Sequence, residues 1–237
     1  MNNQPNTASR EEVKKFYNSF ADHQKRLGIN IRHRTIFKNL RNSGLENDCN
    51  VLEIGCGIGT VSNLILRFLK KGCFVGVDIS NESIETAKKL NSAFKNAEFR
   101  VSDMSDFTHP LKFDIVVLPD VLEHIPLEQH KHLFSVIRSL THPDSVVLIN
   151  IPEPNCLNWA RRHHPENLQI IDQSLSMQDL LNNVYPNEFE LYSLQPYALQ
   201  FTEPDYLSIV LKRKKEHEHY TRKSKLARGR ENLLSKL

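Results

Sequence analysis

The stretch VLEIGCGIGT at residues 51–60 decides the fold of this 237-residue chain. It opens with a short apolar run at 51–54, continues through Gly55, Gly57 and Gly59, and enters an amphipathic segment at Thr60. Glycines directly after a strand let the backbone approach a ligand closely, because glycine has no β-carbon. The stretch therefore predicts the first strand of an α/β sheet, followed by a ligand-binding turn and a helix.

The rest of the chain alternates in the same way. Short apolar runs predict strands, and segments with apolar residues at three- and four-residue spacing predict helices. The expected strands are 51–54, 74–77, 98–101, 113–118 and 146–151, and the expected helices between them are 61–69, 82–90 and 127–140. Such alternation predicts a parallel sheet wrapped by helices.

The two ends of the chain differ from this middle part. Two helices, at 10–20 and 31–40, are expected before the first strand. After Pro152 a polar stretch runs to Gln173, followed by an expected helix at 176–184 and by strands at 189–194 and 207–211 that would form an antiparallel pair at the sheet edge. We expect an N-terminal helical cap at 1–44, a principal domain at 45–212 and a basic tail at 213–237, helical or disordered.

Composition limits the function classes. Residues 212–237 hold ten Lys or Arg against three Glu, about +7, so the net charge of +3 leaves about −4 for the remainder. No apolar run approaches the roughly 20 residues of a membrane span, and no signal peptide is expected. The four cysteines form no C-x-x-C pair or zinc spacing, which indicates reduced thiols in a cytoplasmic protein without a metal site.

Three carboxylates follow three successive expected strands. Glu53 precedes the glycine turn, where it would repel a pyrophosphate but suit an ammonium group. Asp78 ends the second strand, where a carboxylate can accept both ribose hydroxyls, and Ile79 beside it suits a purine face. Asp103 ends the third strand and suits an exocyclic amine, although it also suits a turn cap. Thr60 stands where a dinucleotide-binding turn carries glycine, which argues against a pyrophosphate ligand.

Four motifs in order complete a family pattern. They are EIGCGIG at 53–59, VD at 77–78, SDM at 102–104 and DVLEHI at 120–125. Together they resemble motifs I to IV of the class I S-adenosylmethionine-dependent methyltransferases, over roughly residues 45–151. The chain is most similar to the small-molecule branch, which includes ubiquinone-pathway and sugar or natural-product methyltransferases. The segment 152–237 resembles the family only loosely.

The resemblance implies a Rossmann-like, seven-stranded, mostly parallel sheet flanked by helices, with its last strand antiparallel. It also implies S-adenosylmethionine as cofactor, bound over the carboxyl ends of the first two strands. The implied cofactor-binding residues are Arg34, Glu53, Gly55, Gly57, Asp78, Ile79, Asp103, Met104 and Pro119. Arg34 would pair with the cofactor carboxylate, with Arg32 and His33 beside it as alternatives.

Methyl transfer is an in-line displacement from a strong electrophile, so the protein mainly aligns the nucleophile and excludes water. A base is needed only where the nucleophile has a proton to lose. His124 has a suitable intrinsic pKa and is the expected catalytic residue, with Glu123 orienting it. The alternative is that His124 braces the turn at Pro126.

The sequence thus predicts methyl transfer to an oxygen or nitrogen of a small molecule or saccharide. Trp159 and the group at 161–164 would read an anionic or sugar-like acceptor, or form a solvated loop. The other interpretations are a methyltransferase for RNA or protein docked by the basic tail, an NAD-dependent oxidoreductase, and a catalytically silent scaffold. The pattern argues against nucleic acid and indicates neither a membrane span nor an oligomeric state.

The remaining histidines are expected to be mostly surface residues. These are His109, His130, His132, His142, His163 and His164.

Overall fold

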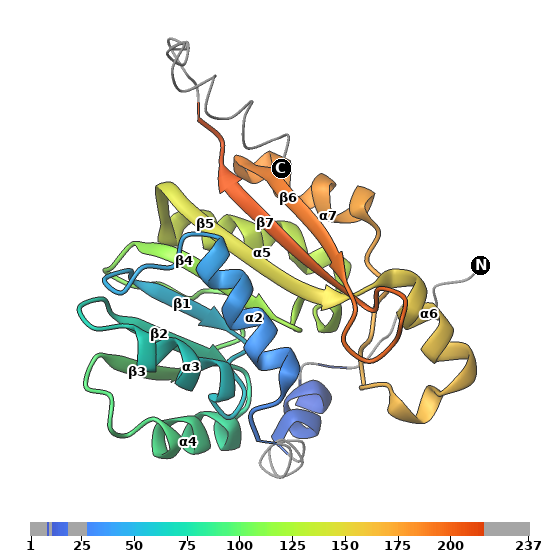
Figure 1. The fold of residues 1–237 in the computed structure, drawn as a ribbon, viewed down its shortest axis with the longest axis horizontal. Helices are drawn as coiled ribbons and strands as arrows, with labels where there is room; N and C mark the ends of the chain where they lie inside the picture. Colours follow the sequence, from blue (N-terminus) through green and yellow to red (C-terminus); the bar gives the residue numbers. More distant parts are fainter. Residues whose placement is uncertain (1–8, 10, 19–27, 216–237) are drawn as a thin grey trace, which may run out of the picture.

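A seven-stranded sheet forms the centre of the computed structural model, which describes residues 9, 11–18 and 28–215 (Figure 1). The strands are β1 (Val51–Ile54), β2 (Phe74–Asp78), β3 (Ala97–Val101), β4 (Phe113–Pro119), β5 (Thr141–Pro152), β6 (Phe189–Tyr197) and β7 (Tyr206–Arg213). Their order in the sheet is β3-β2-β1-β4-β5-β7-β6. Strands β1 to β5 pair in parallel, whereas β7 pairs antiparallel with both β5 and β6. The predicted sheet, including its antiparallel last strand, is confirmed.

Helices cover both faces of this sheet. They are α2 (Ile31–Asn42), α3 (Thr60–Phe68), α4 (Asn81–Leu90), α5 (Leu127–Leu140), α6 (Pro154–His163) and α7 (Met177–Val184), preceded by a helix at residues 11–18. Short 3-10 turns lie at η1 (Leu122–His124), η2 (Pro165–Asn167) and η3 (Tyr185–Asn187).

The core consists of two apolar layers, one on each face. Neighbouring residues of a strand point to opposite faces. Val51 accordingly packs in the layer built with α2, α3 and α4, whereas Leu52 and Ile54 pack in the layer built with α5 and α7. Because both faces of β1 are covered, all four of its residues are buried, including the charged Glu53.

Two elements differ from the sequence prediction. Strand β5 starts at Thr141, directly after α5, and is longer than the predicted run at 146–151. Helix α6 occupies the polar stretch before Gln173, where no helix was predicted. Its start is fixed locally, because Glu153 caps it by accepting a 2.8 Å hydrogen bond from the Cys156 N–H, and Pro154 follows the cap. Leu157 is its one buried residue, so α6 carries no apolar stripe for sequence analysis to detect.

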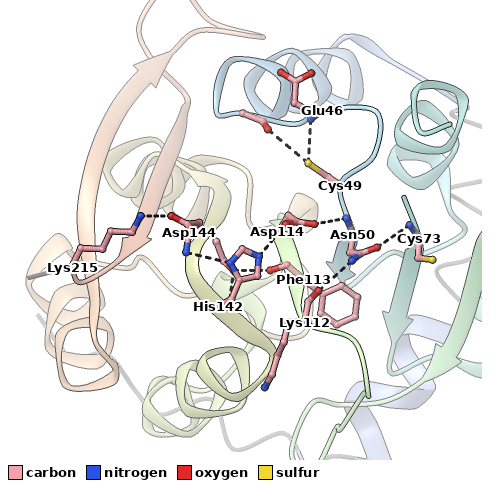
Figure 2. A network of polar contacts seen from close by, with 12 residues as sticks. Glu46, Cys49, Asn50, Cys73, Lys112, Phe113, Asp114, His142, Asp144 and Lys215 are labelled. Atoms are coloured by element: carbon pink, nitrogen blue, oxygen red, sulfur yellow. Dashed lines mark hydrogen bonds and ion pairs between the residues drawn. The ribbon is translucent and has the colours of Figure 1, made fainter. Parts of the chain in front are cut away.

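A polar network ties the amino ends of the strands together, as Figure 2 shows. The Asn50 N–H donates to Asp114 Oδ2 at 2.7 Å, and Asp114 Oδ1 lies 3.0 Å from His142 Nε2. The Asn50 side-chain oxygen accepts from the Cys73 N–H at 3.2 Å. These contacts link β1, β2, β4 and β5 at the end opposite the glycine turn.

Two histidines expected at the surface have buried side chains, with that of His109 6% exposed. His130 is fully buried under η1, with Nε2 2.8 Å from the Ile125 carbonyl and 3.1 Å from the Leu122 carbonyl. The side chain of His109 lies against the Phe107 and Phe113 rings, at centroid distances of 6.4 and 5.3 Å. In the part of the chain that the structure describes, no helix is both long enough and apolar enough to span a bilayer.

Candidate functional site

The glycine turn after β1 adopts the conformations that glycine allows. Gly55, Gly57 and Gly59 have φ angles of 71°, 52° and 84°. A β-carbon on Gly55 would lie 2.2 Å from Val121 Cγ2, because the segment after β4 passes directly beside the turn. The turn therefore brings the carboxyl ends of β1 and β4 into contact.

Asp78, the last residue of β2, holds this turn in place. Its Oδ2 accepts the Gly57 N–H at 2.8 Å, and its Oδ1 accepts the Ser80 N–H at 2.9 Å. Burial raises the pKa of Asp78, against the effect of these two hydrogen bonds. Ile79 is half-buried beside it. The carboxylate thus lies at the predicted place, where its remaining lone pairs suit ribose hydroxyls.

Glu53 has a buried carboxyl group, and one of its two oxygens has no hydrogen-bond partner among the described residues. It is 1% exposed, and its Oε2 accepts a 2.5 Å hydrogen bond from the Ser62 hydroxyl. Oε1 has no hydrogen-bond partner among the described residues. Burial raises the pKa of Glu53 to about 8. A buried carboxylate oxygen without a donor is costly, so this position suits a ligand that brings a cationic N–H group.

The segment after β3 forms a tight turn. Asp103 Oδ1 accepts from the Ser105 N–H at 3.0 Å and from the Ser105 hydroxyl at 2.7 Å, the turn-capping role that the sequence left open. Met104 is buried at a φ of 66°. Their contact with an adenine ring stays a prediction.

Arg32, rather than Arg34, faces the sheet from α2. Residues two apart on a helix point in different directions, and Arg34 lies exposed. Arg32 Nη1 lies 3.1 Å from Asp120 Oδ2 and donates to the Tyr206 hydroxyl at 3.0 Å. Its Nε is buried without a hydrogen-bond partner in the described part of the chain. The cation at this end of the sheet is therefore Arg32.

Asp120 connects Arg32 to a second polar group at the carboxyl end of β5. Pro119 before it is buried at the end of β4, and Asp120 has a φ of 56°. Asn150 donates to Asp120 Oδ1 at 2.5 Å and accepts from the Tyr197 hydroxyl. Sequence reasoning missed Asn150 and Tyr197, which come from different strands. An asparagine inside the apolar run of β5 was the one available signal.

His124, at the end of η1, is enclosed by carboxylates. Its Nδ1 lies 2.5 Å from the Ile171 carbonyl and 3.2 Å from Asp172 Oδ1, and its Nε2 lies 3.8 Å from Glu123 Oε1. Burial opposes its protonation, but Glu123 and Asp172 outweigh that effect and raise the pKa of His124 to about 9. Both ring nitrogens therefore face oxygen atoms of the protein.

Glu123 lies beside His124 and is 1% exposed. Burial raises its pKa to about 8, although the positive charge of His124 acts in the opposite direction. Its Oε2 is buried and has no hydrogen-bond partner within the described residues. Glu123 thus resembles Glu53, because one oxygen of its buried carboxyl group can still accept a hydrogen bond.

The helix at residues 11–18 lies against these groups. Asn18 accepts a 2.7 Å hydrogen bond from the Ser80 hydroxyl at the end of β2. The Tyr17 ring centroid is 6.1 Å from that of His124. This helix therefore contacts the ends of both halves of the sheet, where it can exclude water.

Helix α6 supports the segment that carries Asp172. Arg161 donates to the Asp172 carbonyl at 2.6 Å and to the Ser174 hydroxyl at 3.2 Å. Trp159 is partly exposed and lies near His163 and Phe201, at centroid distances of 5.1 and 5.6 Å. Trp159 and the group at 161–164, which were predicted to recognise the acceptor, thus lie on or at the end of helix α6. Arg161 stabilises the segment at residues 172–174.

Several curated proteins are similar to this chain in sequence. Malonyl-[acyl-carrier protein] O-methyltransferase 1 of Ilyobacter polytropus is 28% identical over 125 residues, 52% of this chain and 44% of that protein. Trans-aconitate 2-methyltransferase of Escherichia coli is 26% identical over 133 residues, 56% of this chain and 49% of that protein. The chain matches less than two thirds of the length of these relatives.

Solved structures share the fold at low identity. Magnesium protoporphyrin IX methyltransferase from Synechocystis PCC 6803, solved with bound SAH, aligns with a TM-score of 0.68 and 18% identity, covering 87% of this chain and 100% of that one. An S-adenosylmethionine-dependent methyltransferase from Clostridium acetobutylicum aligns with a TM-score of 0.64 and 14% identity, covering 84% and 99%. The family described as "Methyltransferase domain" matches residues 45–220. The chain belongs to this methyltransferase-domain family.

Proposed function

We propose that this protein transfers a methyl group from S-adenosylmethionine to an oxygen or nitrogen atom of a small molecule or saccharide. The observation that carries the proposal is Glu53, whose buried Oε1 lacks a donor beside a glycine turn. The ammonium group of the cofactor supplies such a donor. The residues present therefore fit this cofactor, and Glu53 would disfavour a pyrophosphate at the same place.

Each remaining part of the cofactor has a matching group in the protein. Arg32, with its unpartnered Nε, takes the role that the sequence assigned to Arg34 and would hold the cofactor carboxylate. Gly55, Gly57 and Pro119 would border the methionine part. The ribose would bind Asp78, and the adenine would lie among Ile79, Asp103 and Met104.

The bound cofactor supplies an electrophilic methyl group on a sulfonium. The protein then has to hold the acceptor atom in line with the methyl group and to exclude water. The helix at 11–18 serves the second task through its contacts at Ser80 and His124. We place this activity in the cytoplasm, where the four free cysteines would stay reduced.

An oxygen nucleophile has the stronger support. A curated relative is named as a malonyl-[acyl-carrier protein] O-methyltransferase. In this chain, the Tyr197 and Tyr206 rings stack at 5.8 Å, with their hydroxyls joined to Asn150 and Arg32. Hydroxyl, amide and guanidinium groups at the end of β5 suit a hydrogen-bonding acceptor.

Calorimetry with S-adenosylhomocysteine, S-adenosylmethionine and NADH tests the proposal. The two sulfur ligands are expected to bind and NADH is not. Glu53→Gln should weaken the binding of both sulfur ligands at least tenfold, because a neutral amide replaces the anion facing the ammonium. Release of S-adenosylhomocysteine in the presence of phenol, sugar and amine acceptors then identifies the acceptor class. A wild-type protein that binds neither sulfur ligand at millimolar concentration would sink the proposal.

A further inference from the structure

Both ring nitrogens of His124 face oxygen atoms of the protein. Nδ1 is taken by the Ile171 carbonyl at 2.5 Å and by Asp172 at 3.2 Å. Nε2 faces Glu123 Oε1 at 3.8 Å. A histidine acting as a base needs one nitrogen that is unprotonated and directed at the substrate. The geometry around His124 instead suits an imidazolium held between two carboxylates.

Glu123 has a carboxylate oxygen that can accept a proton. Its Oε1 is on the His124 side, and its buried Oε2 has no hydrogen-bond partner among the residues described. The charged or titratable groups whose electrostatic influence reaches Glu123 come from six segments: Tyr17, Arg32, Asp120, His124, Asp172 and Tyr206. None of them donates a hydrogen bond to Oε2, so within the described residues this oxygen keeps its capacity to accept one.

Two of the three carboxylates near His124 each lie close to one cation. Asp120 lies 3.1 Å from Arg32, and Asp172 lies 3.2 Å from His124. Glu123 shares the His124 cation through one oxygen only. Both oxygens of Asp120 and both oxygens of Asp172 already have partners, whereas Glu123 Oε2 has none among the described residues, so Glu123 is the carboxylate that can take a proton without losing a hydrogen bond.

We propose that Glu123 Oε2 accepts the proton of the methyl acceptor, and that His124 is a positioning residue, anchored by Asp172, whose positive charge favours the ionised form of Glu123. This inference rests on the proposed methyl transfer. It assigns the acceptor to the class of hydroxyl or N–H compounds whose proton must leave.

The step balances without a further reagent. The acceptor oxygen or nitrogen forms a bond to the methyl carbon while the carbon–sulfur bond breaks. The electron pair of the broken bond stays on sulfur, which becomes a neutral thioether. The acceptor proton moves to Glu123 Oε2, which becomes a carboxylic acid. Its return to solvent after product release restores the carboxylate.

Nuclear magnetic resonance of the full chain labelled with ¹⁵N-histidine tests this arrangement without turnover. His124→Gln identifies the His124 signals. In the wild type, His124 is expected to carry protons on both nitrogens at pH 7.5 and to titrate near pH 9. Glu123→Gln and Asp172→Asn should each lower that pKa by about one unit or more, since each removes a facing anion. Glu128→Gln, an exposed change on α5, is the matched control and should leave it unchanged.

The second measurement is the methyl-transfer rate with whichever of the phenol, sugar and amine acceptors proves to be a substrate. Glu123→Gln should lower kcat by about 100-fold or more while the affinity for S-adenosylhomocysteine changes little. His124→Gln should keep kcat within about tenfold at its optimum. It should also move the acidic limb of the pH profile upward, because Glu123 without the nearby cation protonates more easily.

The outcomes separate this inference from the proposed function. A His124 that is neutral at pH 7.5, with Nε2 unprotonated, overturns the assignment to Glu123 even if no acceptor has been found. So does a Glu123→Gln variant with wild-type kcat. Failure of the wild type to bind S-adenosylhomocysteine in the same samples instead overturns the methyltransferase proposal itself.

Discussion

At the scale of single residues, the choice between Arg32 and Arg34 has a direct test. Arg32→Gln leaves the Asp120 carboxylate, whose side chain is 15% exposed, without its cation. The cost should be about 1–3 kcal/mol, less than for a fully buried pair because 35% of the Arg32 side chain is exposed. Affinity for S-adenosylhomocysteine should also fall. Arg34→Gln removes the same charge from the exposed side of α2 and should change neither quantity. Urea unfolding and calorimetry measure the two effects, and equal behaviour of the variants would contradict the assignment.

Gly55 provides a second test at this scale. Gly55→Ala places a methyl group 2.2 Å from Val121 Cγ2 at a φ of 71°. Backbone strain of about 1–2 kcal/mol and overpacking of about 1–3 kcal/mol should add, giving a loss of roughly 2–5 kcal/mol in the free energy of unfolding. Gly44→Ala, at a φ of 107° with no atom within 4 Å, carries the strain without the overlap. It should therefore unfold at higher urea concentration than Gly55→Ala.

The positions that sequence analysis could place are those set by local pattern, although their contacts with a cofactor stay predictions. Glu53, Gly55, Gly57 and Asp78 lie together at the carboxyl ends of β1 and β2, because they sit within or just after apolar runs whose pairing is determined. The direction of Arg32 depends instead on how α2 rotates about its axis when it packs. That rotation involves the distant Asp120 and Tyr206, which no local pattern reveals.

At the scale of elements, the start of α2 should be sensitive to pH. Asn30 accepts the His33 N–H at 3.2 Å, and His33 Nδ1 accepts the Asn30 N–H at 3.1 Å, as in a capping box. Burial and the nearby Arg32 lower the pKa of His33 from 6.5 to about 4. A lowered pKa in the folded state means that the stabilisation is complete above about pH 6.5 and is lost as the pH falls toward 4.

His33→Gln tests this capping box, because glutamine can accept the same hydrogen bond and does not titrate. Between pH 7 and pH 4.5 the wild type should lose about 1–2 kcal/mol more of its unfolding free energy than the variant does. Parallel curves for the two proteins, measured by urea unfolding at each pH, would exclude the effect.

The turn η1 depends on a helix residue behind it. His130 on α5 faces the Leu122 and Ile125 carbonyls, so His130→Leu should cost about 1–2 kcal/mol in unfolding free energy. His132→Leu, which removes an exposed contact to the Ser105 carbonyl, is the control and should cost about 0.5 kcal/mol or less. Similar losses in both variants would show that His130 does not hold the turn.

Elements were predicted well where burial leaves a periodic pattern. Strand β1 and helices α3 to α5 match their predicted ranges closely, because each has apolar residues facing a core layer. Helix α6 was missed because capping by Glu153 and Pro154 fixes it rather than an apolar stripe. The start of β5 was missed because Thr141 to Ser145 are mostly polar and pair with β4 only through a register shift.

At the scale of the whole molecule, cofactor binding should stabilise the folded state. A ligand at 100 times its Kd adds about 2.7 kcal/mol, so S-adenosylhomocysteine at that excess should raise the Tm by about 5–10 °C in a chain of this size. NADH at the same concentration should give no shift. Equal shifts with both compounds would indicate unspecific stabilisation.

The position of β7 between β5 and β6 has a consequence for synthesis on the ribosome. Strand β6 leaves the ribosome before β7, yet its described strand partner is β7 alone. Until residue 213 has emerged, β5 has an open edge and β6 has no place in the sheet. The nascent chain therefore exposes an unpaired apolar edge until late in translation, when chaperone protection matters most. Nascent chains stalled with residue 213 still inside the ribosome and chains stalled after it has emerged should differ sharply in the protease resistance of β6.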